Sequence, residues 1–190
     1  MSLFLPDSVK CNGDTFKPLI PRKELEKRIE VLGSQISNDF QDKRPIFIGV
    51  LNGAFVFLAD LLRSISINCE VDFLKLSSYG DEKVSSGKVT DKKQIDADIE
   101  GRHVILVEDI VDTGLSIKYL INKMYEKNPA SVSVVTLLHK TDATIYDVKI
   151  DYTGFKIPTL FVLGYGLDYA QEGRNLAQIY VIDEKSTIKD

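Results

Sequence analysis

Short, almost wholly apolar runs constrain the fold of this chain more than any other feature. Three of them, residues 46–51, 104–107 and 132–138, carry apolar side chains on both faces of an extended strand. Strands of this kind are typical of parallel sheets that are covered by helices on both sides. Further stretches at 69–77, 152–155, 160–163 and 179–182 also read as strands.

Between these runs the apolar residues follow a helical period. In residues 22–42 they recur every three or four positions, which predicts one buried helix face; they are Leu25, Ile29, Leu32, Ile36 and Phe40. Residues 54–64 and 116–127 read as two further helices. The alternation of strands and helices predicts an α/β fold with a mostly parallel central sheet flanked by helices.

Composition excludes several classes of protein. The chain has 190 residues, 44% of them hydrophobic, and a formal net charge of −4, so it is too apolar and too weakly charged to be disordered. It has neither an apolar run long enough for a transmembrane helix nor a basic, apolar leader. Cys11 and Cys69 cannot form a disulfide framework, which favours a reducing, cytoplasmic location. The acidic balance argues against binding to nucleic acid or a membrane.

The most informative segment follows the apolar run 104–107. Two adjacent carboxylates, Glu108 and Asp109, come directly after it, and Asp112, Thr113 and Gly114 precede the helix, with Ser116 as a possible cap. Ligands of open α/β sheets bind at the carboxyl ends of strands. A turn there, with a helix N-terminus behind it, directs backbone N–H groups at an anion. The carboxylates suit sugar hydroxyls or a magnesium ion.

Two other patterns limit the alternatives. The sequence contains no G-x-x-x-x-G-K-[ST], which excludes a P-loop nucleotide hydrolase. Residues 79–93 are polar and contain two glycines; a stretch of this length is a lid, a binding loop or a solvated hairpin.

Val107 to Ile117 resembles the phosphoribosyl pyrophosphate (PRPP) motif of the type I phosphoribosyltransferases, and the closest branch acts on hypoxanthine and guanine. The resemblance runs from about residue 46 to residue 183 and includes four more segments. These are Leu51-Asn52-Gly53, Ser78-Tyr79, Leu137-Leu138-His139-Lys140-Thr141, and residues 161–169 with Arg174.

The resemblance implies a single domain, residues 1–190, with the type I phosphoribosyltransferase fold. A core at about 40–150 would carry the sheet. A small hood would combine residues from about 1–20 and 152–190, and residues 78–93 would form a mobile loop.

The resemblance also assigns the PRPP site. Glu108 and Asp109 would hold the ribose hydroxyls and Mg²⁺, and Asp112 would act as general base for the purine. The 5′-phosphate would bind at Asp112, Thr113, Gly114, Leu115 and Ser116. Pyrophosphate would bind at Asn52, Gly53 and Arg174, and the catalytic loop would begin with Ser78 and Tyr79. The family commonly has lysine where this chain has Asn52, which removes a positive charge from the pyrophosphate loop.

The same resemblance implies the purine site. Lys140 would donate to the 6-oxygen, Phe161 would stack on the ring, and backbone groups of Val162 and Asp168 would read the base edge. Ile110 would line this site, and Asp168 would hold a second Mg²⁺. His139 is expected to be structural because neighbours in a strand point to opposite sides.

The implied activity is purine salvage: a Mg²⁺-dependent transfer from PRPP to hypoxanthine or guanine that gives the nucleoside monophosphate and pyrophosphate. A xanthine-preferring enzyme is one alternative. A regulator of the same fold that senses PRPP or nucleotide and binds RNA is another. The family implies a homodimer or homotetramer, for which the apolar helix at 54–62 is a candidate interface.

Overall fold

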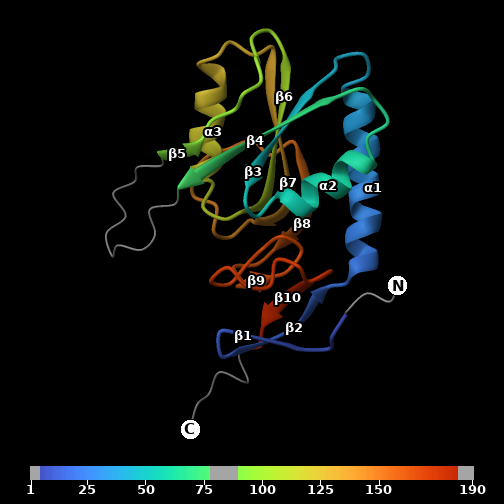
Figure 1. The fold of residues 1–190 in the computed structure, drawn as a ribbon, viewed down its shortest axis with the longest axis vertical. Helices are drawn as coiled ribbons and strands as arrows, with labels where there is room; N and C mark the ends of the chain where they lie inside the picture. The colour runs from blue at the N-terminus through green and yellow to red at the C-terminus, as the bar shows by residue number, and fades with distance from the viewer. Residues whose placement is uncertain (1–4, 78–89, 184–190) are drawn as a thin grey trace.

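Two sheets of different size organise the molecule in the computed structural model, which describes residues 5–77 and 90–183. A six-stranded sheet lies in the upper part of Figure 1 and a four-stranded sheet in the lower part. Five strands of the large sheet are parallel, in the order β4-β3-β6-β7-β8, and β5 pairs antiparallel with β4 at the edge. The strands are β3 (Ile46–Leu51), β4 (Glu70–Ser77), β5 (Thr90–Lys93), β6 (His103–Val111), β7 (Ser131–Lys140) and β8 (Tyr152–Ile157).

Helices cover both faces of the large sheet, as the sequence predicts. α1 (Arg22–Asp39) and α2 (Phe55–Arg63) pack on one face, and α3 (Leu115–Tyr125) packs on the other. The periodic apolar positions of α1 are buried as expected, with Leu25, Leu32 and Ile36 fully inaccessible to solvent. The mostly parallel α/β fold is therefore confirmed.

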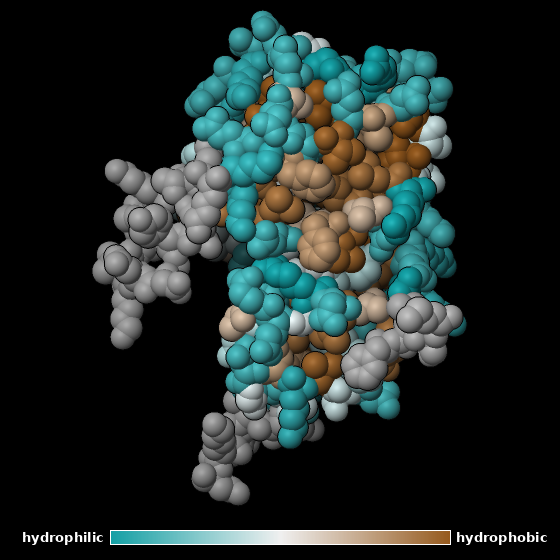
Figure 2. Space-filling model, viewed as in Figure 1, coloured by the Kyte–Doolittle hydropathy of each residue, from teal (hydrophilic) through white to brown (hydrophobic). Residues whose placement is uncertain are grey.

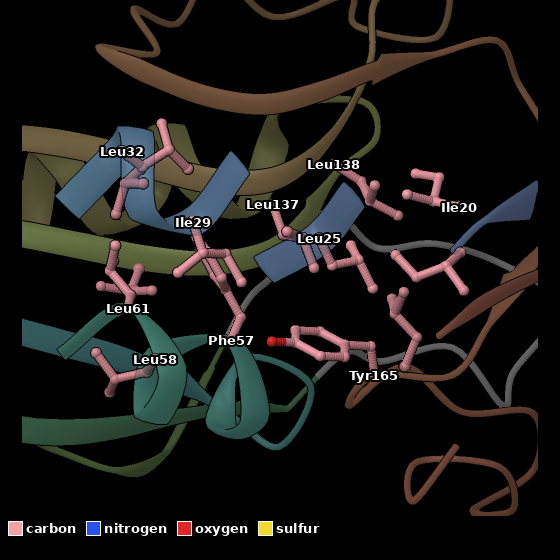
Figure 3. Close-up of a cluster of buried hydrophobic side chains, with 14 of the residues drawn as sticks. Ile20, Leu25, Ile29, Leu32, Phe57, Leu58, Leu61, Leu137, Leu138 and Tyr165 are labelled. Carbon is pink, nitrogen blue, oxygen red and sulfur yellow. The ribbon is translucent and has the colours of Figure 1, made fainter. Parts of the chain in front are cut away.

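The four-stranded sheet is antiparallel, in the order β1-β2-β10-β9. Its strands are β1 (Val9–Cys11), β2 (Asp14–Ile20), β9 (Val162–Leu163) and β10 (Ile179–Ile182). Phe16 and Tyr180 are fully buried in its own small core. Other side chains from this part, including Ile20 and Tyr165, join the larger core under α1 and α2 (Figure 3).

The strand boundaries correct three expectations. β6 does not end at Val107 but continues to Val111, because β7 pairs with it as far as the Val111–His139 register. The expected hood begins at about residue 152 and so includes β8, but β8 pairs in parallel with β7 in the large sheet. Residues 90–93 form β5 instead of the end of a loop.

The hairpin of β1 and β2 was not predicted from the sequence. Its turn is Asn12-Gly13, and both residues have positive φ, 51° and 88°. Asn-Gly is the strongest short-range signal for such a turn, so the sequence did contain the information. Across the described ranges, no helix has the length and apolar character that crossing a membrane requires.

Candidate active site

The turn between β6 and α3 lines a cavity of about 90 Å³, formed by residues 108 and 110–117. Gly114 holds the N-cap position of α3 with a φ of 88°. A Cβ at Gly114 would lie 3.1 Å from Cγ2 of Val148, so both backbone conformation and space favour glycine. α3 begins at Leu115, so the prediction that Ser116 caps the helix is wrong. Ser116 lies within the first turn, where backbone N–H groups lack helical partners.

A neighbouring segment, residues 144–146, donates hydrogen bonds to the backbone carbonyls of this turn. The carbonyl oxygen of Thr113 accepts hydrogen bonds from the backbone N–H groups of Ile145 and Tyr146, both at 3.1 Å. The Thr144 hydroxyl donates to the Asp112 carbonyl at 2.8 Å. These contacts fix the backbone of the turn. The Leu115 N–H donates to the Thr113 hydroxyl at 3.4 Å, a long hydrogen bond for which an anion in the cavity would be a stronger acceptor.

Burial disfavours the charged form of both adjacent carboxylates of β6, Glu108 and Asp109. Burial, with the negative charge of Asp109 added, raises the pKa of Glu108 well above its usual value. Burial also raises the pKa of Asp109, an effect that the backbone N–H of Ile110 and the Arg174 guanidinium partly offset. Glu108 Oε2 is buried without a hydrogen-bond partner among the described residues.

A buried carboxylate oxygen without a hydrogen-bond partner, such as Glu108 Oε2, is suited to bind a cation. Within residues 5–77 and 90–183, no three His, Cys, Asp or Glu side chains are grouped closely enough to hold a metal ion by themselves. Mg²⁺ commonly binds through one or two carboxylates and completes its shell with substrate oxygens and water. Glu108 and Asp109 fit that mode, and a cation beside them would favour their charged forms.

Asp112 and Lys140 lie together at the carboxyl ends of β6 and β7. Lys140 Nζ donates to Asp112 Oδ2 at 2.7 Å, and the Lys140 side chain is only 12% exposed. His139 Nε2 lies 3.0 Å from the Thr144 hydroxyl. Burial lowers the pKa of His139. His139 therefore braces the Thr144 segment, in line with a structural role.

The segment after β3 fits against Asp109 without room for a side chain. A Cβ at Gly53 would lie 1.6 Å from Asp109 Oδ2, and a Cβ at Gly166 would lie 2.2 Å from the Gly53 carbonyl oxygen. The Leu51–Asn52 peptide is cis. Asn52 Oδ1 accepts a hydrogen bond from Lys75 Nζ at 3.2 Å.

Arg174 joins the segment 164–174 to the same region. Its guanidinium pairs with Asp168 at 2.7 Å and donates to the Gly166 carbonyl at 2.8 Å. Arg174 and Asp168 both influence the pKa of Asp109, the first lowering it and the second raising it.

Phe161 directly precedes β9 of the small sheet. It is 45% exposed, and its ring packs against Tyr169 and Phe16 with centroids 5.0 and 6.1 Å away. Val162 lies next to it in β9 and is buried. Ser78 and Tyr79 lie outside the described residues.

One partly buried pair was not predicted, between Tyr165 and Asp60. The Tyr165 hydroxyl donates to Asp60 Oδ2 of α2 at 2.5 Å, and Figure 3 shows the ring directed from the 164–174 segment toward α2. Burial and the Asp60 carboxylate raise the pKa of Tyr165. Because the partners are 105 positions apart, no local pattern marks this pair.

Comparisons with known proteins identify the family of this chain. A family model described as a phosphoribosyl transferase domain matches residues 20–170. A hypoxanthine-guanine phosphoribosyltransferase of Bacillus subtilis is 43% identical over 169 residues, which cover 89% of this chain and 94% of the relative.

Solved structures give the same result. A hypoxanthine-guanine phosphoribosyltransferase of Bacillus anthracis has a TM-score of 0.84 and 39% identity, covering 88% of this chain and 98% of its own. A hypoxanthine phosphoribosyltransferase of Staphylococcus aureus has a TM-score of 0.85 and 32% identity, covering 91% and 94%. The match of one family model and of these relatives over most of the chain shows that it belongs to the phosphoribosyltransferase family, in the branch of the hypoxanthine-guanine enzymes.

Proposed function

We propose that this chain transfers the phosphoribosyl group of PRPP to hypoxanthine or guanine, releasing pyrophosphate. The observation that carries the proposal is the Asp112–Lys140 ion pair, whose Asp112 also lines the cavity at the start of α3. A base and a cationic donor placed side by side suit a purine with an acidic ring N–H and a 6-oxygen. The hypoxanthine-guanine enzymes among the relatives support this choice.

The ribose phosphate would occupy the cavity at the start of α3. The 5′-phosphate would accept hydrogen bonds from the N–H groups of the 112–116 turn and from the hydroxyls of Thr113 and Ser116. Glu108 and Asp109 would accept from the ribose hydroxyls and hold Mg²⁺, which would neutralise the charge of the pyrophosphate leaving group.

The purine would separate Asp112 from Lys140. Asp112 would accept the proton of the purine imidazole, and Lys140 would donate to the 6-oxygen, which an adenine amino group cannot accept. Phe161 would stack on the base, while Ile110 and the backbone of Val162 and Asp168 would line its edge.

The other end of the substrate would meet Asn52, Gly53 and Arg174. The guanidinium of Arg174 would bind pyrophosphate through its fork of donors. Ser78 and Tyr79 would close over the site and exclude water, which otherwise hydrolyses PRPP.

A panel of bases tests the proposed function. With PRPP and Mg²⁺, we expect hypoxanthine and guanine to yield nucleotide and pyrophosphate in equal amounts, and adenine to yield neither. The measurement is product formation by chromatography, with xanthine included to distinguish a xanthine-preferring enzyme. Consumption of none of the bases, or preferred consumption of adenine, contradicts the proposal.

The buried carboxylate of Glu108 gives a prediction about stability. Because its pKa is raised in the folded state, its contribution to stability is largest below its unfolded pKa and is lost as the pH rises through the folded value. Glutamine does not ionise, so Glu108→Gln should not lose stability as the pH rises. We expect the variant to gain about 1–3 kcal/mol relative to the parent at neutral pH without metal, and less as the pH falls.

Chemical denaturation in the presence of a chelator measures the difference in unfolding free energy between Glu108→Gln and the parent. The difference should be smallest at low pH, where Glu108 is protonated in both the folded and the unfolded state, and this point is the internal control. The same variant should lose most of its activity with Mg²⁺ and PRPP. An unchanged difference in stability across the pH range would contradict the assigned environment of Glu108.

We further infer that β1, β2, β9 and β10 form the hood over a core sheet, within one catalytic domain, and that the enzyme works in the cytoplasm as a homodimer or homotetramer. Apolar side chains gather over α2 in Figure 2, and Phe55 at the start of α2 is 44% exposed. Such a surface is typical of an interface between subunits. The two free cysteines suit a reducing compartment.

A further inference from the structure

Lys75 reaches the segment after β3 from the neighbouring strand. In the parallel register of β3 and β4, Leu51 lies beside Lys75. The Lys75 side chain therefore extends from the strand that borders the end of β3, and its Nζ donates to Asn52 Oδ1 at 3.2 Å. The contact places an ammonium group at the loop to which the proposed function assigns the pyrophosphate.

The charges around this loop show why Lys75 is available to a ligand. Arg174 is paired with Asp168 at 2.7 Å, and Lys140 with Asp112 at 2.7 Å. Lys93, which lies opposite Lys75 in β5, is bound by Asp72 and Asp96. Among the side chains that the structure describes, no carboxylate forms an ion pair with Lys75. Its described partner is the neutral amide oxygen of Asn52.

The same hydrogen bond orients the Asn52 side chain. With Oδ1 accepting from Lys75, the Nδ2 group carries two donors that face away from the ammonium. An anion at this loop would therefore meet amide donors and an ammonium group that has no carboxylate partner among the described side chains. A hydrogen bond from a charged donor to an anion is stronger than one between neutral groups.

We propose that Lys75, together with Asn52, binds the pyrophosphate group of PRPP and of the product. The positive charge of the pyrophosphate loop is supplied by the adjacent strand β4 rather than by the loop itself. This inference rests on the proposed function and adds a binding residue to it. Glycine at position 53 lets the pyrophosphate loop lie against Asp109, because a side chain at this position would collide with the Asp109 carboxylate.

Lys75→Gln tests the proposal against Lys27→Gln, which removes the same charge from the exposed face of α1. We expect the KM for PRPP and the inhibition constant for pyrophosphate to rise about tenfold in Lys75→Gln. The KM for hypoxanthine should stay within about twofold, and Lys27→Gln should match the parent. The KM for PRPP should also depend less steeply on salt in Lys75→Gln than in the parent.

A second substitution, which returns a positive charge to the loop, distinguishes a loss of pyrophosphate binding from a structural defect. In the Lys75→Gln background, Asn52→Lys should restore most of the affinity for PRPP, because the ammonium returns to the loop. A KM for PRPP within twofold of the parent in Lys75→Gln would overturn the proposal, as would a loss that Asn52→Lys does not restore. A parent protein that forms no nucleotide would instead refute the proposed function, so the two failures are distinct.

Discussion

Asp112→Asn is expected to reduce kcat at saturating hypoxanthine by about 10²–10⁴-fold, the usual effect of losing a general base. The amide keeps the shape of Asp112 but cannot accept the purine proton. The change should leave the fold intact, because Asp112 is half exposed and its ion pair with Lys140 contributes little to stability. The measurement is steady-state nucleotide formation at saturating hypoxanthine and PRPP.

Asp142→Asn is the matched control for this experiment. Asp142 is exposed and lies two positions after Lys140, so the substitution removes the same charge near the site without touching the proposed base. We expect its kcat to equal that of the parent. If base-saturated turnover of Asp112→Asn stays within about twofold of the parent, Asp112 is not the general base.

Gly166→Ala is expected to abolish most activity by separating two loops. The new Cβ would lie 2.2 Å from the Gly53 carbonyl oxygen, and the φ of Gly166 is 103°. The strained backbone costs about 1–3 kcal/mol. The 164–174 segment must also shift away from Gly53, and misplacement of about 1 Å costs about 10²-fold in rate. Both loops carry proposed pyrophosphate ligands, so the KM for PRPP should rise as kcat falls.

Gly13→Ala separates the two causes of this effect. Gly13 also has a positive φ, 88°, but no atom lies within 4 Å of a Cβ built there. We expect this variant to lose stability through its backbone while keeping its activity. Denaturation and steady-state kinetics on both variants measure the difference. Activity of Gly166→Ala within about twofold of the parent would show that contact between the loops is unimportant.

The sequence predicted the parts of the fold that depend on local patterns. The apolar runs of β3, β6 and β7 and the periodic apolar face of α1 each bury their side chains in the structure. The end of β6 was misplaced because Glu108 and Asp109 look like a turn, while pairing with β7 keeps them in the strand. A strand continues where a partner satisfies its backbone, which local polarity does not reveal.

The site was predicted as a set of motifs rather than as an arrangement. Residues 108 and 110–117 line one cavity because they are near neighbours in the chain, and Asp109 is not among its lining residues. The Asp112–Lys140 pair, the contact of Gly53 with Gly166, and the Lys75–Asn52 hydrogen bond join segments 23 or more residues apart. Such contacts depend on strand order and register, and no pattern along the chain encodes them separately.

A crystal structure of the chain with inosine monophosphate and magnesium pyrophosphate tests the central claim most directly. The account predicts the 5′-phosphate within hydrogen-bond distance of the backbone N–H groups of residues 113–116 and Lys140 Nζ at the 6-oxygen of the base. Asp112 should face the imidazole edge of the purine. A nucleotide bound elsewhere, for example in the cavity of about 330 Å³ between α3 and residues 147–151, would contradict it.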